Sequence, residues 1–157
     1  MAVIRVGPED FDMAAELAAL QEDAGDAGAI ASFLGIVRRG VDNPITAMTL
    51  EHYPGMTERA IAAMAAEAEA RWSLAGCRIL HRTGRIAAGG RIVLVATAAP
   101  HRQAALESTA FLIDWLKVDA PFWKKEHRQS GDGQWVEARE ADDVAASRWG
   151  KGPAVRS

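Results

Sequence analysis

Hydrophobic and polar positions along the chain follow two periods, and together they predict a mixture of strands and helices. Short β-branched or alternating runs favour strands, whereas apolar residues three and four positions apart favour helices. The pattern predicts strands over 3–6, 29–38, 45–53, 78–86 and 91–99, a short hairpin ending in 134–138, and helices over 10–22, 57–72, 100–117 and 140–149.

The order of these elements indicates an α+β layered domain. Strand pairs alternate with single helices through short turns, and the regular alternation of a doubly wound parallel sheet is missing. We expect 45–53 to pair with 29–38 as a hairpin, and the unbroken apolar run 92–96 to mark a central strand. Gly35, inside a strand, predicts either a bulge or a close approach to the backbone. Thr57 is the expected N-cap of its helix.

Length, charge and cysteine content narrow the class of protein. At 157 residues we expect a single domain over 1–150 and a flexible tail over 151–157. The net charge of -3 gives no reason to expect a nucleic-acid or membrane partner. The only cysteine, Cys77, excludes an internal disulfide and fits a reducing cytoplasm. No signal-peptide core is visible at the N-terminus, so a cytoplasmic location is expected.

Lys117 is the first candidate for chemistry. It continues the helical row Leu106, Ala110 and Ile113 and lies roughly 20° from Leu106 around the axis. A lysine on an apolar stripe can be dehydrated, which lowers its pKa and supplies a base or nucleophile. The alternative is that the side chain snorkels to water at the helix C-terminus, which position alone favours.

His101 and Arg102 open the same helix, where unpaired backbone N–H groups favour an anion. Arg102 can bind phosphate through a bidentate fork, and His101 can donate a hydrogen bond or carry a proton. A solvated pair is the alternative. Because His101 and Lys117 are 16 steps apart, or about 24 Å, one straight helix cannot bring both to one small site. We therefore expect a homodimer whose pocket crosses the interface.

Two further basic pairs could face the same ligand. Arg38 and Arg39 close a strand and are surface residues unless Gly35 lets a ligand approach the backbone. Lys124 and Lys125 follow a turn built from a proline and two aromatic residues. Adjacent side chains of an extended segment point to opposite faces, so we expect only one of these lysines to face the site.

Seven short motifs carry a resemblance to a known family. In order they are Phe33–Arg38, Leu50–Met56, His81–Gly84, Ala99–Arg102, Leu116–Lys117, Ala120–Glu126 and Trp135–Arg139. In this order and spacing the chain resembles the large, catalytic subunit of molybdopterin synthase.

The resemblance implies an α/β hammerhead fold with an additional small antiparallel β subdomain. It implies a heterotetramer, in which a homodimer of large subunits carries a small ubiquitin-like sulfur-carrier subunit at each end. The carrier's C-terminal Gly-Gly tail, as a thiocarboxylate, would enter the pocket. Two sulfurs would then pass to cyclic pyranopterin monophosphate and form the dithiolene of molybdopterin. No cofactor or metal is expected on this chain.

By motif position, the resemblance also implies a set of site residues. Lys117 is the expected catalytic lysine, with Lys124 supporting it. The substrate-binding set is Ile36, Val37, Arg38, His101, Arg102, Lys117, Lys124, Lys125 and Glu126, and Arg139 of a second copy is a further candidate. Relatives often carry lysine at position 36, so a contact of Ile36 is expected through its backbone.

Two other classes of function stay open. A non-catalytic dimeric module could use the same arginines to bind an anionic metabolite or a partner's C-terminal carboxylate, without needing Lys117. RNA binding through basic and aromatic residues is the other, and the acidic balance disfavours it.

Overall fold

The structure is a computed structural model, and it describes residues 2–136 and 140–150. The expected α+β class is confirmed, and each described helix begins and ends within three residues of its prediction. The elements are β1 (Val3–Gly7), α1 (Met13–Asp23), β2 (Ala29–Ile36), β3 (Ile45–His52), α2 (Met56–Trp72), β4 (Gly76–Arg82), β5 (Gly84–Ala87), β6 (Arg91–Ala99), α3 (Arg102–Val118), β7 (Phe122–Arg128), β8 (Gly131–Val136) and α4 (Glu140–Ser147). The expected tail over 151–157 lies outside the described residues.

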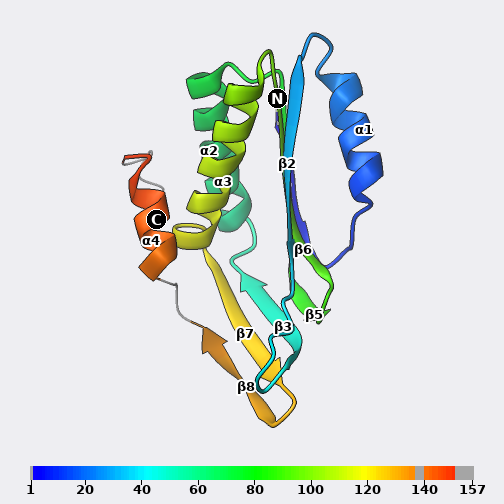
Figure 1. Ribbon diagram of the computed structural model, residues 1–157, viewed down its shortest axis with the longest axis vertical. Helices are drawn as coiled ribbons and strands as arrows, with labels where there is room; N and C mark the ends of the chain where they lie inside the picture. The colour runs from blue at the N-terminus through cyan, green and yellow to red at the C-terminus, as the bar shows by residue number, and fades with distance from the viewer. Residues whose placement is uncertain (1, 137–139, 151–157) are drawn as a thin grey trace.

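The larger sheet has the strand order β1-β4-β6-β2. Helices α2 and α3 cover one of its faces and α1 covers the other, as Figure 1 shows with the sheet seen nearly edge-on. The prediction of a central strand over 92–96 is confirmed, because β6 lies between β4 and β2 and is buried from Val93 to Ala99. Strands β4 and β6 contribute Ile79, Val93 and Val95 to the main core, which α2 and α3 complete.

The smaller sheet has the order β5-β3-β7-β8 and extends from one end of the larger sheet (Figure 1). All of its neighbouring strands are antiparallel. Its own core consists of Val37, Ile45, Met48, Leu50 and Ile86. This second sheet corresponds to the small β subdomain that the resemblance implies, and residues 122–128, expected only as an extended segment, form one of its inner strands.

Two predictions about the strands are wrong: one concerns the pairing of 45–53, and the other the extent of 78–86. The segment 45–53 does not pair with 29–38, because β2 pairs with β6 and β3 pairs with β5 and β7. The predicted bulge is confirmed as a register shift between Gly35 and Ile36, and the chain then leaves the larger sheet. The segment 78–86 is two strands, because Gly84, with φ +79°, turns the chain out of one sheet and into the other.

The loop before α2 ties this helix to the start of β7. Thr57 is not the N-cap as predicted; that position is Gly55, whose φ of +84° favours glycine. The carboxylate of Glu58 accepts a hydrogen bond from the Gly55 N–H at 2.5 Å. Thr57 is instead fully buried, where its hydroxyl accepts from the Tyr53 N–H at 3.1 Å and donates to the Pro121 carbonyl at 3.3 Å.

No helix in the described part of the chain is long and apolar enough to cross a membrane.

Candidate active site

Two lysines from separate elements converge on one buried histidine. Lys117 lies in the last turn of α3 and Lys124 lies in β7, while His81, only 8% exposed, lies near the end of β4. The pKa of His81 is lowered to about 4, chiefly by burial; the hydrogen bond to the Arg82 carbonyl opposes this, and the charges of Lys117, Lys124 and His52 add to the lowering. Phe122, which stacks on His81, lies two residues before Lys124 and five residues after Lys117, so the chain brings both lysines into the neighbourhood of this ring. The fold therefore brings the expected catalytic lysine and its expected supporting lysine to the same place.

An aromatic stack of His81 and Phe122 lies beside Lys117 and Lys124, and we call the surroundings of these two lysines the lysine site. The rings of His81 and Phe122 are parallel within 15°, with centroids 3.8 Å apart. His52 lies on β3 and is paired with Phe122 on β7, and the centroids of their rings are 6.4 Å apart. The Nε2 atom of His52 is 3.6 Å from the Glu58 carboxylate. These contacts link β4 of the larger sheet, β3 of the smaller sheet and the start of α2 to Phe122, the first residue of β7.

Lys124 and Lys125 leave β7 from opposite faces. Lys124 is paired with Leu50, which is buried in the core of the smaller sheet, so Lys124 projects from the core-facing side. Lys125 is paired with Thr49 and lies 5.9 Å from the centroid of the exposed Trp135 ring. The expected alternation is therefore present, and Lys124 is the lysine on the side of His81.

The position of Lys117 on α3 differs from its prediction. The buried face of α3 is formed by Ala105, Ser108, Thr109, Phe111, Leu112, Trp115 and Leu116. The row that begins at Leu106 follows the margin of that face, because Leu106 is 63% exposed and Lys117 is also exposed. The prediction of a lysine on a buried stripe is therefore wrong. The helix is covered by β2 and β6 on one side and by α2 on another, which leaves this row beside an edge strand.

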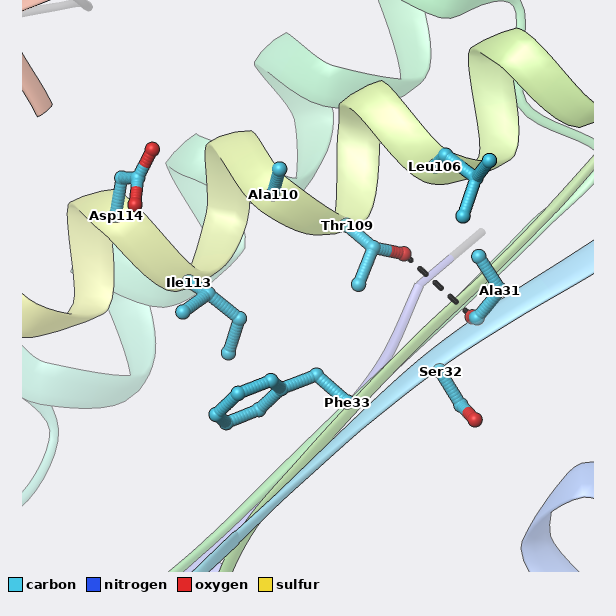
Figure 2. Close-up of a pocket in the computed structure, with 8 residues that line it drawn as sticks. All are labelled: Ala31, Ser32, Phe33, Leu106, Thr109, Ala110, Ile113 and Asp114. Carbon is cyan, nitrogen blue, oxygen red and sulfur yellow. Dashed lines mark hydrogen bonds between the residues drawn. The ribbon is translucent and has the colours of Figure 1, made fainter. Parts of the chain in front are cut away.

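A cavity of about 350 Å³ lies along this margin, between α3 and β2. Figure 2 shows Leu106 and Ile113 on the helix pointing toward Ala31 and Phe33 on the strand, and Ala110 also lines the cavity. The Thr109 hydroxyl closes one side through a 3.5 Å hydrogen bond to the Ala31 carbonyl. None of the candidate site residues lines this cavity.

His101 and Arg102 lie at the opposite end of α3 from Lys117. His101 is the N-cap residue, with φ -131° and ψ 154°, and its side chain makes no capping hydrogen bond. Both side chains are exposed. The helix separates them from the lysine site by about 24 Å, so within one chain His101 and Arg102 are far from the two candidate catalytic lysines.

The remaining candidates follow β2 and β7. Ile36 is 53% exposed, and Arg38 is exposed beyond it. Val37 is buried in the core of the smaller sheet, and its N–H and C=O bond to Gly90 and Gly89, so its backbone is already occupied. Glu126 accepts a hydrogen bond from Arg128 at 2.6 Å. Arg139 lies outside the described residues.

Cys77 does not have the properties of a nucleophile. It is 1% exposed within the main core, and burial raises the pKa of its thiol to about 12. Its packing role is therefore the one that the structure supports. Among residues 2–136 and 140–150, no group of three or more His, Cys, Asp or Glu side chains could hold a metal ion.

Sequence reasoning missed the residues that surround the lysines. His52 and His81 appear only as members of motifs, and neither Glu58 nor Phe122 is among the predicted site residues. No sequence signal singles out His81, because the strand 76–82 also contains Arg78, which is equally buried. The stack on Phe122 joins positions 41 residues apart, so no local spacing could reveal it.

Comparison with known proteins gives a consistent family. Residues 6–119 match the family described as MoaE protein. A molybdopterin synthase catalytic subunit from Mesorhizobium japonicum is 52% identical over 147 residues, which cover 93% of this chain and 92% of that protein.

Solved structures agree with the sequence comparison. A MoaE protein of molybdopterin biosynthesis from Burkholderia ambifaria MC40-6 superposes with a TM-score of 0.82 at 48% identity, covering 96% of this chain and 99% of that one. In a complex of subunits 1 and 2 of molybdopterin-converting factor from Helicobacter pylori 26695, the matching chain gives a TM-score of 0.69 at 26% identity, with coverages of 88% and 90%.

The two-sheet fold and these similarities define the class: an enzyme of molybdenum cofactor biosynthesis. The chain belongs to the MoaE protein family, in which its curated relatives are molybdopterin synthase catalytic subunits. The expectations of family, fold and enzyme class are thereby confirmed.

Proposed function

We propose that this chain transfers two sulfurs from a small ubiquitin-like carrier subunit to cyclic pyranopterin monophosphate. The carrier's C-terminal Gly-Gly tail arrives as a thiocarboxylate, and the product is the dithiolene of molybdopterin. The observation that carries the proposal is the placement of Lys117, in the last turn of α3, and Lys124, on β7, on either side of Phe122, which stacks on the buried His81. Family membership supports it, and so does the solved complex of the two subunits in a relative.

The lysine pair fits the chemistry of the sulfur-delivering tail. A thiocarboxylate is an anion, and two ammonium groups at the end of α3 and on β7 can bind it. In each transfer the thiocarboxylate sulfur forms a carbon–sulfur bond at a side-chain carbon of the pterin while a carbon–oxygen bond at that carbon breaks, and the oxygen leaves as water or stays on the phosphate where the ring opens. Water then cleaves the acyl–sulfur bond of the resulting thioester, so the sulfur stays on the pterin and the tail becomes an ordinary carboxylate. Adding sulfur and opening the cyclic phosphate both need proton transfers, and Lys117 is the proposed acid–base group, with Lys124 supporting it. A docked tail would cover Lys117, which is exposed in the single chain.

The substrate phosphate needs the second half-site. His101 and Arg102 supply hydrogen-bonding and cationic groups at a helix N-terminus that favours an anion. Arg38 would add a further cation, but within one chain it follows the far end of β2, whose first residue, Ala29, pairs with Ala99 beside His101. The 24 Å length of α3 supports a homodimer in which each pocket takes its phosphate-binding and catalytic groups from different chains. Arg139 of the second chain would belong to the same pocket. Motif position also assigns Ile36, Val37, Lys125 and Glu126 to substrate binding. Smaller contributions are expected from Val37, which is buried with both backbone groups bonded, and from Lys125, which leaves the opposite face of β7 from Lys124.

The assembly and location follow from the same proposal. One carrier at each end of the homodimer gives a heterotetramer. The chain acts as one domain over residues 1–150. Its proposed location is the cytoplasm, since a single free cysteine, Cys77, is compatible with a reducing compartment.

Replacing each lysine of β7 in turn tests this assignment. In a sulfur-transfer assay with the carrier and the pterin substrate, Lys124→Ala is expected to lower the rate about 100-fold, because it removes a cation from the lysine site. Lys125→Ala is expected to cost less than about tenfold, because its side chain leaves the opposite face of β7. Circular dichroism of each variant controls for folding. An equal loss in both variants, or a larger loss for Lys125→Ala, would contradict the assignment.

A further inference from the structure

His81 is a buried polar ring that the proposed chemistry does not itself use. A buried polar group costs stability unless it is hydrogen-bonded. The Nδ1 atom of His81 is 2.9 Å from the Arg82 carbonyl oxygen, and because a carbonyl only accepts, Nδ1 carries the proton. With a pKa of about 4 the ring is neutral near pH 7, so it adds no third positive charge beside Lys117 and Lys124.

The ring of His81 contacts Phe122, the first residue of β7, and β7 is the strand that carries Lys124. Phe122 opens β7 and lies two positions before Lys124, so both side chains leave the same face of the strand. The His81 ring covers Phe122 at 3.8 Å, and the core strand β4 holds His81 in the larger sheet. The next residue towards α3, Pro121, is held from the other side by Thr57. The start of β7 is thus fixed from two directions.

We propose that His81 is a positioning residue for sulfur transfer: by stacking on Phe122 it sets where Lys124 lies relative to Lys117. This inference rests on the proposed function of the two lysines. The stack couples the larger sheet, which carries α3 and Lys117, to the smaller sheet, which carries Lys124. A displacement of about 1 Å between reacting groups can cost about 100-fold in rate, so a rigid stack has a direct consequence for catalysis.

Substitution at position 81 tests the stack separately from the hydrogen bond. His81→Leu fills a similar volume without a flat ring, and its kcat is expected to fall at least about tenfold while KM for the carrier changes less than about twofold. His81→Phe keeps a flat ring, and its kcat is expected to return to within about threefold of the wild type. A merely structural histidine would not give this split between kcat and KM, nor the rescue by phenylalanine.

His127 offers a matched control on β7 itself. It is a half-buried histidine bonded to the Thr49 hydroxyl at 2.7 Å, on the opposite face from Phe122 and Lys124. His127→Leu is expected to keep kcat within about twofold. A loss equal to that of His81→Leu would show a general effect of disturbing the small sheet, and would overturn the proposal.

A double-mutant cycle gives the second readout. Phe122→Leu should lower kcat as His81→Leu does, and the double variant should lose no more than the worse single variant, because both remove one stack. Multiplying losses would overturn the proposal, as would a folded but inactive His81→Phe. If His81→Leu does not fold, His81→Phe and Phe122→Leu carry the test with the same criteria. Wild-type kcat in His81→Leu, with Lys117→Ala inactive, would overturn the role of His81 alone. An active Lys117→Ala would instead overturn the catalytic role of Lys117 on which this inference rests.

Discussion

Replacing Lys117 with alanine is expected to lower the rate of sulfur transfer about 1000-fold or more, with carrier binding changed less than about threefold. Loss of an acid–base group alone costs about 100- to 10,000-fold, and Lys117 also contributes charge at the thiocarboxylate. Because Lys117 is exposed, its removal leaves no cavity, and the free energy of unfolding should change by less than about 0.5 kcal/mol. Single-turnover kinetics and urea denaturation of the same preparation measure both quantities.

Lys117→Arg separates the proton from the charge. Arginine keeps a positive charge but stays protonated, so it cannot act as a base. If Lys117 moves a proton, the arginine variant should be nearly as inactive as the alanine variant while it binds the carrier normally. Near wild-type transfer by Lys117→Ala would show that Lys117 is not the acid–base group and would remove the main residue of the proposed mechanism.

The second large effect is the rescue of two inactive chains by one another. Mixing equal amounts of His101→Ala and Lys117→Ala chains should restore about a quarter of the wild-type activity. Random pairing makes about half of the dimers mixed, and each mixed dimer has one pocket in which both half-sites are intact. The expectation follows from α3, whose 17 residues keep His101 and Lys117 at opposite ends.

A different mixture provides the control for this rescue. Lys117 and Lys124 belong to the same half-site of one chain, so mixing Lys117→Ala with Lys124→Ala chains should restore nothing. Rescue in this control, or no rescue of the first mixture with mixed dimers confirmed by mass spectrometry, would contradict a pocket shared between chains.

Local patterns were sufficient for the helices and the central strand, because their periodicity follows directly from one buried face. The apolar run in β6 is buried on both sides of the sheet, which is why it has no polar alternation. The bulge at Gly35 was also predictable, since a glycine inside a strand favours an irregular backbone.

Strand pairing was not predictable in the same way. Residues 45–53 are adjacent in sequence to 29–38, and adjacent strands usually pair. Here the loop after Gly35 carries the chain into a second sheet, where β3 finds its partners in β5 and β7. Those partners are distant along the chain, so no local signal distinguishes the two arrangements.

The environment of the site residues was the hardest part to predict. A helical wheel places Lys117 in the same row as Leu106, but it does not show which side of the helix the sheet covers. The buried side is the neighbouring row of side chains, and the row of Leu106 and Lys117 lies at its margin. The half-site separation followed from helix geometry alone and is present in the fold. The contact between His81 and Phe122 depends on how two sheets meet, and only the tertiary structure shows it.

Transfer of labelled sulfur tests the central claim most directly. The carrier is prepared with radioactive sulfur in its C-terminal thiocarboxylate and incubated with this chain and cyclic pyranopterin monophosphate. The expected result is loss of label from the carrier and two labelled sulfurs in each pterin product. Binding of the carrier with its label left in place, and a pterin without sulfur, would contradict the claim and identify the chain as a non-catalytic binding module.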